Sequence, residues 1–209
     1  MKPKILVIDY RTGNSQSVSY ALANLGIDHQ VARHPSEVEH ITHIILPGVG
    51  AAGTTMDYLA ADGWLDFLNQ QVQEARIPFL GVCVGLQVIF ERSDEQEATC
   101  LGWLPGDVTA FNRGAVRVPH MGWNRVTSAG DHPFAAAIPP DAYVYFVNSY
   151  RANPRDPADV AGITDYDGEF AAVVARKNIM ATQFHIEKSG PVGLALLNRF
   201  ATLTSEDLR

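Results

Sequence analysis

The first ninety residues alternate short apolar runs with segments of helical spacing. Residues 4–10 form an almost unbroken apolar run, which is typical of a strand buried on both faces of a parallel sheet. Apolar residues then recur at helical spacing over 18–25, after a helix cap at Asn14 or Ser15. Further strands are predicted over 29–32, 43–46 and 79–82, and further helices over 65–75 and from 85 to 90. Strands alternating with helices indicate a parallel α/β sheet.

The second half of the chain has a different pattern, with short apolar runs separated by Pro, Gly, Asn and Asp. This pattern favours antiparallel strands added to the parallel core. Strands are predicted over 116–118, 143–148, 171–176 and 179–184, surface loops over 131–133 and 151–157, and a closing helix after Pro191. No repeat or long linker divides the sequence, so we expect a single domain over residues 1–209.

Composition narrows the class of protein. With 46% hydrophobic and 19% charged residues, the 209-residue chain is typical of a compact globular protein. The net charge of −7 argues against a nucleic-acid or anionic-membrane surface. No apolar run approaches the roughly 20 residues needed to span a bilayer, and two cysteines make no disulfide framework. We therefore expect a cytoplasmic protein with reduced thiols.

The most informative segment is Phe79-Leu-Gly-Val-Cys-Val-Gly85, in which a buried strand leads into a cysteine flanked by two glycines. A helix is predicted directly after it. This order matches the Gly-x-nucleophile-x-Gly elbow, with Cys83 as the nucleophile. The glycines are needed because the turn is crowded, and a Cβ there would clash with neighbouring backbone. A lone cysteine is more often a buried structural residue, and the strand–turn–helix context favours the nucleophile.

A thiolate that attacks an amide needs a proton carrier and a group that orients it. His185 follows an apolar strand, and Glu187 lies two residues later, on the same side of an extended chain. A carboxylate beside an imidazole fixes its tautomer and stabilises the imidazolium. No histidine has the spacing of a metal ligand, so we predict no metal site. An isolated His-x-Glu pair is more often a surface pair, and the cysteine elbow makes a triad credible.

A glycine-rich segment, Pro47-Gly-Val-Gly50, ends an earlier strand. Its backbone can offer an N–H to a developing oxyanion, alongside the N–H of Val84 after the nucleophile. The segment could also be a plain β-turn. It lacks the length and the lysine of a phosphate-binding loop.

Two of these segments, Gly81-Val-Cys-Val-Gly-Leu-Gln87 and Gln183-Phe-His-Ile-Glu187, resemble the signatures of class I glutamine amidotransferases. Within that class the chain resembles the glutaminase subunits of imidazole glycerol phosphate synthases over nearly its whole length. The further segments that carry this resemblance are Pro47-Gly-Val-Gly-Ala51, Pro119-His-Met-Gly-Trp-Asn124, Tyr145-Phe-Val-Asn-Ser-Tyr150 and His185-Ile-Glu-Lys-Ser-Gly190.

The resemblance implies a flavodoxin-like, mostly parallel sheet with helices on both faces, added antiparallel strands and no cofactor. It implies that L-glutamine is cut by Cys83, His185 and Glu187. The ammonia would pass to a (β/α)8-barrel cyclase in a 1:1 heterodimer, which makes imidazole glycerol phosphate and a carboxamide ribotide in histidine biosynthesis. The remaining implied roles are oxyanion binding by Val49, Gly50 and Val84, substrate binding by Gln87, Ser149 and Tyr150, and partner contact by Met121, Trp123 and Lys188.

The chain departs from the family pattern near these residues. Ile186 replaces a usual Pro, Asn148 a common His, and Tyr10-Arg-Thr-Gly-Asn14 a more usual Tyr-Gly-x-Gly-Asn. These departures bear on the acceptor reaction, because paralogues supply ammonia to synthases acting on different acceptors, including those that modify sugar nucleotides for surface polysaccharide. The sequence could also belong to a non-catalytic regulatory subunit or to a cysteine hydrolase without a synthase. The intact triad disfavours the regulatory subunit, and the 119–124 segment disfavours the hydrolase.

Overall fold

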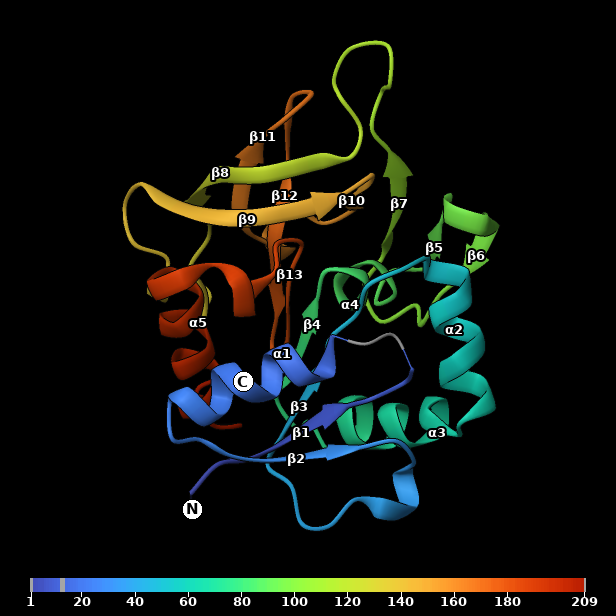
Figure 1. The fold of residues 1–209 in the computed structure, drawn as a ribbon, viewed down its shortest axis with the longest axis vertical. Coiled ribbons are helices and arrows are strands. Elements are labelled where there is room, and N and C mark those ends of the chain that lie inside the picture. Colours follow the sequence, from blue (N-terminus) through green and yellow to red (C-terminus); the bar gives the residue numbers. More distant parts are fainter. Residues whose placement is uncertain (1, 12–13, 209) are drawn as a thin grey trace.

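The computed structural model describes residues 2–11 and 14–208 of the chain. One sheet runs through the described residues, and Figure 1 shows it twisting strongly from β2 to β11. Its strands are β1 Lys4–Ile8, β2 Asp28–Ala32, β3 His43–Leu46, β4 Phe79–Val82, β5 Arg92–Ser93, β6 Ala98–Thr99, β7 Gly106–Ala110, β8 His120–Ser128, β9 Ala142–Asn148, β10 Tyr150–Pro154, β11 Val160–Asp165, β12 Glu169–Arg176 and β13 Ile179–Thr182.

The parallel half of the sheet has the order β2-β1-β3-β4-β13. β1, β3, β4 and β13 are almost wholly buried, because helices cover both faces of a parallel sheet. Their near-continuous apolar sequences are what this burial requires. The prediction of a flavodoxin-like α/β core is confirmed.

Mostly antiparallel strands extend the sheet beyond β13, as the second half of the sequence predicted, and β5 pairs with β7 in parallel. β12 pairs with β13, and β10, β7, β5 and β6 follow in that order. β11 leaves this path to pair with β8, and β8 pairs with β9. The long β8 and β9 strands cross in front of the others in Figure 1.

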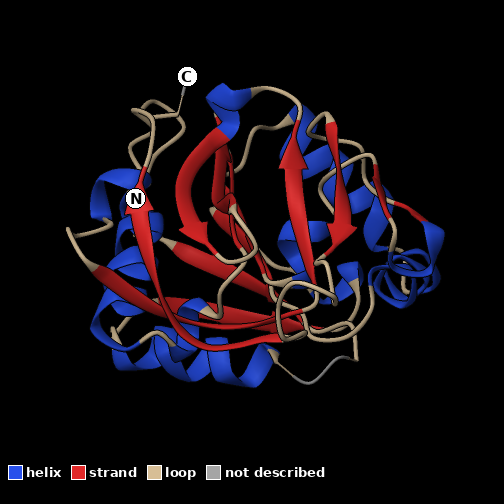
Figure 2. Cartoon of the chain, turned by 90° about the horizontal axis from the view of Figure 1, so that it is seen from above, coloured by secondary structure: helices blue, strands red, loops and turns tan. Residues whose placement is uncertain are grey.

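The helices lie around the periphery of the strands, as the view from above shows (Figure 2). They are α1 Ser15–Asn24, α2 Ala52–Ala61, α3 Trp64–Leu68, α4 Val84–Gln87 and α5 Gly190–Thr202, and short turns follow several strands. α1 and α5 cover the face turned toward the viewer in Figure 1, and α3 passes behind the strands. His43 connects β3 to α5. Its ring packs edge-on against the ring of Phe200, and its Nε2 lies 2.9 Å from the Leu203 carbonyl oxygen.

An aromatic cluster fills the space between β8, β9 and β12. His120 stacks between Tyr166 and Phe146, at centroid distances of 4.0 and 4.6 Å, and Phe111 and Phe170 meet it edge-on. Burial lowers the pKa of His120 to about 4. This histidine is therefore a neutral core residue at neutral pH.

Several elements differ from the sequence prediction. The predicted strand at 116–118 is irregular backbone, and the loop predicted at 151–157 contains most of β10, because its residues pair with β7. The helix predicted from 85 to 90 is the single turn α4, which ends at Gln87, and residues 88–90 are buried in the core after it. The helix predicted over 65–75 is divided into α3 and a π-helical turn at Asn69–Glu74. α2 was not predicted.

Among the described residues, no helix is both long enough and apolar enough to cross a membrane.

Candidate active site

The pairing of β4 with β13 places the predicted catalytic residues at one edge of the sheet. The two strands are parallel, and Val82 lies opposite Thr182 at their carboxyl ends. Cys83 is the next residue after β4, and its N–H donates to the Thr182 carbonyl at 2.8 Å. His185 therefore lies only three residues beyond the paired strand end, beside the cysteine. In open α/β sheets this carboxyl edge is where ligands bind.

Cys83 occupies a strained turn between β4 and α4. Its φ of +55° is unusual for a residue with a side chain, and strain of this kind clusters at functional sites. Both flanking glycines are required by close backbone contacts. A Cβ on Gly81 would overlap the Gly85 carbonyl, and one on Gly85 would overlap the Leu46 carbonyl at the end of β3. The elbow predicted from the sequence is thus present in its geometry.

His185 and Glu187 form a buried pair across a short turn. His185 Nδ1 lies 2.9 Å from Glu187 Oε1, and both side chains are almost completely excluded from solvent. We predicted this contact by assuming that residues 185–187 are extended, and that assumption was wrong. Residues Ile186–Lys188 form a 3-10 turn instead. Strand β9 holds this turn, since the Tyr145 carbonyl accepts the His185 N–H at 2.9 Å.

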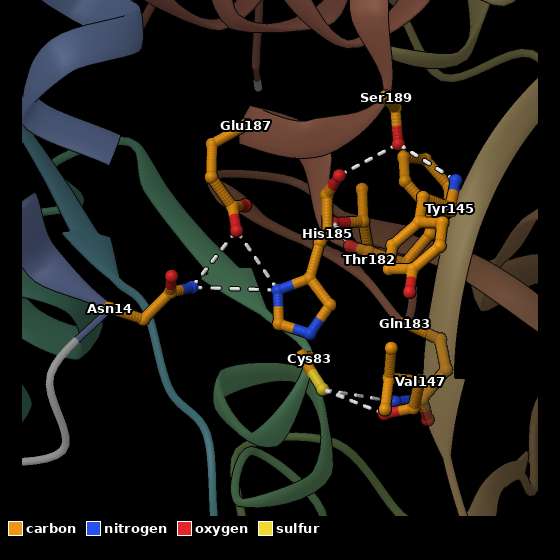
Figure 3. Close-up of polar contacts among 10 residues, drawn as sticks. Asn14, Cys83, Tyr145, Val147, Thr182, Gln183, His185, Glu187 and Ser189 are labelled. Carbon is orange, nitrogen blue, oxygen red and sulfur yellow. Dashed lines mark hydrogen bonds and ion pairs between the residues drawn. The ribbon is translucent and has the colours of Figure 1, made fainter. Parts of the chain in front are cut away.

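Asn14 joins the pair from the start of α1 (Figure 3). Its Nδ2 donates to Glu187 Oε1 at 3.0 Å and lies 3.4 Å from His185 Nδ1. Because Nδ2 and the protonated Nδ1 are both donors, they share the carboxylate oxygen, and the 3.4 Å approach is a consequence of that sharing. The sequence predicted a helix cap at Asn14 or Ser15. Asn14 does precede the first helical residue, but its side chain makes no capping hydrogen bond.

The charges of the pair favour a protonated imidazole. Burial alone would lower the pKa of His185, but the Cys83 sulfur and the Glu187 carboxylate raise it to about 10. Burial also acts to raise the pKa of Glu187, whereas His185 and Asn14 hold it below its ordinary value. At neutral pH the site therefore contains an imidazolium held between a carboxylate and a sulfur.

A cavity of about 250 Å³ opens in front of Cys83 and His185. It is smaller than the roughly 300–1,000 Å³ of sites for drug-sized ligands, and so suits a small substrate. Its other lining residues are Val49, Gly50, Val84, Gln87, Glu95, Pro119, Val147, Asn148, Ser149 and Tyr150. Among the described residues, no group of three or more His, Cys, Asp or Glu could hold a metal ion.

All predicted oxyanion and substrate residues line this cavity. Val49 and Gly50 follow β3, the strand next to β4, and Gly50 has a φ of +115° that favours glycine. Val84 is the first residue of α4, where an N–H has no partner within the helix. Gln87 also reaches the cavity, although its amide donates to Gln183 Oε1 at 3.3 Å.

Glu95 is a cavity residue that the sequence did not single out. It is half-buried, and its Oε2 accepts the Ala52 N–H at 2.9 Å. Burial raises the pKa of this carboxyl group above its ordinary value. Glu95 lies in a polar, turn-rich stretch shortly after the cysteine motif, and its contact with Ala52 joins positions far apart in the sequence, so only the folded structure identified it.

The predicted partner residues lie on an exposed surface beside the cavity. Met121 and Trp123 project from β8 with 63% and 56% of their area accessible, and Tyr143 on β9 is 55% accessible. Lys188 is exposed on the 3-10 turn directly after Glu187. A cluster of large, solvent-exposed apolar side chains is typical of an interaction surface.

The raised pKa of His185 can be tested by titration. We expect the imidazole NMR signals of His185 to remain those of the protonated ring from pH 6.5 up to about pH 10. Cys83→Ala should lower this pKa, because it removes the sulfur. The charged ring should stabilise the folded state fully below pH 6.5, and this stabilisation should be lost as pH rises through about 10. His120, which titrates near 4, is the internal control. A His185 that loses its proton near 6.5 would contradict this account.

Comparison with known proteins agrees with this geometry. The family model of class-I glutamine amidotransferases matches residues 6–202. The imidazole glycerol phosphate synthase subunit HisH of Synechococcus sp. (strain JA-3-3Ab) is 40% identical, with 98% of this chain and 96% of that protein aligned. Subunit HisH 2 of Pseudomonas aeruginosa is also 40% identical, over 95% of this chain and 99% of its own length.

Solved structures give the same fold. A crystal structure of a glutamine amidotransferase superimposes with a TM-score of 0.74 at 18% identity, covering 93% of this chain and 98% of that one. The structure of PurLQS from Thermotoga maritima gives 0.74 at 20% identity, covering 96% and 98%. From its sequence and its fold together, the chain belongs to the class-I glutamine amidotransferases and, within them, to the family of imidazole glycerol phosphate synthase HisH subunits.

Proposed function

We propose that this chain is a glutaminase subunit that releases ammonia from L-glutamine and passes it to a (β/α)8-barrel cyclase. The cyclase would use the ammonia to make imidazole glycerol phosphate and aminoimidazole carboxamide ribotide in histidine biosynthesis. One observation carries the proposal. The strained Cys83 elbow and the 2.9 Å His185–Glu187 pair meet at a single small cavity, in a chain about 40% identical to HisH subunits along its length.

The proposed reaction begins with attack of the Cys83 thiolate on the carboxamide carbon of glutamine. The oxyanion that forms accepts hydrogen bonds from the N–H of Val84 and from the backbone at Val49–Gly50. The imidazolium of His185 then protonates the departing nitrogen, and ammonia leaves as the γ-glutamyl thioester forms. Neutral His185 takes a proton from water, which attacks the thioester carbon. Collapse of the second tetrahedral intermediate breaks the carbon–sulfur bond, releases glutamate and restores the Cys83 thiolate beside the His185 imidazolium.

Glu187 serves as the orienting group in this scheme. Its carboxylate fixes the Nδ1 proton of His185 and leaves Nε2 to face the sulfur and the substrate. Every group that moves a proton or forms a bond is a side chain, water or the substrate, so the reaction uses no cofactor.

Polar groups on the cavity wall are positioned to bind the amino-acid end of glutamine. Glu95 is the carboxylate among the lining residues, and it faces a site where a substrate ammonium would be a favourable partner. Gln87, Ser149 and Tyr150 supply neutral donors and acceptors around it. A small polar cavity of this kind suits free glutamine better than a peptide side chain.

The exposed surface of Met121, Trp123 and Lys188 is the proposed contact with the cyclase in a 1:1 heterodimer. It adjoins the cavity, so ammonia would have a short path to the partner. Trp123 packs edge-on against Tyr145 at 5.9 Å, which supports the ring as a rigid anchor. Residues 1–209 would act as one domain in the cytoplasm, and the single continuous sheet supports the assignment of one domain.

The triad can be separated from the synthase reaction by mutation. Cys83→Ala or His185→Ala should abolish glutamine-dependent turnover of the complex and leave turnover with added ammonium nearly intact, because the two reactions use different sites. Glu187→Gln should be milder than either, since losing an orienting group costs less than losing the nucleophile. Assays with each nitrogen source make the comparison. Equal losses with glutamine and ammonium would refute the assignment.

The partner can be identified by reconstitution. Mixing the chain with the histidine-pathway cyclase should give a 1:1 complex and accelerate glutamine cleavage by about 10²-fold, comparable to gaining one oxyanion donor. Lys188→Ala should weaken this acceleration without lowering Tm, because Lys188 is exposed. Activation by a different barrel-type synthase and its sugar substrate, with no response to the cyclase, would instead favour a paralogue.

A further inference from the structure

Gln183 is a fully buried polar residue beside the nucleophile, and the reaction proposed for the triad does not use it. It follows β13 directly, two residues before His185, and it is completely excluded from solvent. An amide in such surroundings needs hydrogen-bond partners within the protein, because burying it without them is unfavourable. The partners of this side chain therefore indicate what it does.

The two ends of the Gln183 amide have different partners. Its Oε1 accepts a hydrogen bond from Gln87 Nε2 at 3.3 Å. With Oε1 held in this way, Nε2 points toward the nucleophile and lies 3.9 Å from Cys83 Sγ (Figure 3). Sulfur is a larger and weaker acceptor than oxygen, so its hydrogen bonds are longer. In the described part of the chain, this sulfur is the acceptor that Gln183 Nε2 reaches.

The sulfur of Cys83 contacts two groups that suit different protonation states. The Val147 carbonyl of β9 also lies 3.9 Å from Sγ, and because it can only accept, it suits the neutral thiol. The Gln183 amide nitrogen can only donate, so it suits the thiolate, and a donor binds a charged acceptor more strongly than a neutral one. The imidazolium of His185 favours the same charged form. Gln183 is thus a second, uncharged donor to the ionised sulfur.

We propose that Gln183 is a catalytic residue of glutamine cleavage: its Nε2 donates to the ionised sulfur of Cys83, and Gln87 fixes the orientation of the amide. This inference rests on the proposed glutaminase function. The donor acts twice, first on the thiolate that attacks the carboxamide carbon and again when the carbon–sulfur bond of the thioester breaks and the thiolate leaves. Because Gln87 lines the cavity, these contacts also connect the substrate site to the nucleophile.

Gln183→Met tests the donor, because methionine has a similar length and no N–H. The rate at which iodoacetamide alkylates Cys83 in the whole chain is followed by peptide mass spectrometry from about pH 4 to about pH 10. We expect the pH profile to move upward by about one unit, since a hydrogen bond to a charged group is equivalent to roughly one to two units. A general loosening of the structure would change the rate at every pH without displacing the profile. Cys100 is resolved separately, because burial raises its pKa to about 11.

Gln87→Met makes the same measurement with Gln183 left in place, and so keeps the test valid if Gln183→Met does not fold. Without Gln87 the Gln183 amide can turn and present its Oε1 to the sulfur. We therefore expect a displacement in the same direction. The double variant should be displaced no further than Gln183→Met alone, because both changes act through one donor.

Asn178→Leu is the matched control. Asn178 is also a buried amide, and it lies next to the opposite end of β13. Its Nδ2 donates to the carbonyls of Val72 and Ile77 at 2.9 and 3.0 Å. Its replacement removes buried hydrogen bonds at the other end of the strand from Cys83, so it should lower Tm without displacing the alkylation profile.

Kinetics of the complex with the synthase partner complete the test. Gln183→Met should lower kcat with glutamine roughly 10-fold, the equivalent of about one pH unit, and leave turnover with added ammonium unchanged. An alkylation profile that Gln183→Met does not displace, or that Asn178→Leu displaces equally, would overturn the role of Gln183. Full glutamine turnover by Cys83→Ala would instead overturn the proposed function. Alkylation requires no glutaminase activity, so the two failures are distinguishable.

Discussion

The parallel pairing of β4 with β13 is the constraint on which the rest of the site depends. Because Val82 lies opposite Thr182, the residues after both strands emerge at one edge. A cysteine and a histidine that are about one hundred positions apart in the sequence become neighbours. β3 lies on the other side of β4 and delivers the glycine-rich segment to the same edge. Shifting either register by one residue would turn the side chains to opposite faces and separate these groups.

Close backbone packing makes this arrangement rigid. Gly85 lets α4 approach the Leu46 carbonyl, and Gly193 lets α5 approach the Ile186 carbonyl next to Glu187. The first contact fixes the nucleophile turn, and the second fixes the turn that carries the carboxylate. Asn14 then supplies a donor from a third element, so that α1, α4 and the turn after β13 all meet at His185. Rigid support of this kind is what a catalytic geometry requires.

The sequence predicted the parallel core well, because β1, β3, β4 and β13 are buried on both faces and their sequences are almost wholly apolar. It singled out Cys83, His185 and Glu187 from two short motifs, although the His185–Glu187 contact is made across a 3-10 turn and not along extended backbone. α2 was missed because its sequence, AGTTMDYLAA, has small residues and few apolar positions at helical spacing. The 151–157 segment was taken for a loop because its prolines and charges are typical of turns, while the pairing of β10 with β7 is a long-range contact. Asn14 and Glu95 make their contacts with residues distant in sequence, so the pattern of residues around them did not indicate these contacts.

The structural surroundings of Cys83, and not its residue type alone, make it the nucleophile. Cys100 provides the comparison within the same chain, since burial raises the pKa of its thiol to about 11. A diazo-ketone analogue of glutamine, followed by peptide mass spectrometry, measures which thiol reacts. We expect labelling at Cys83 alone, with much slower labelling in His185→Ala. Labelling mainly at Cys100, or labelling of Cys83 that is indifferent to His185, would contradict it.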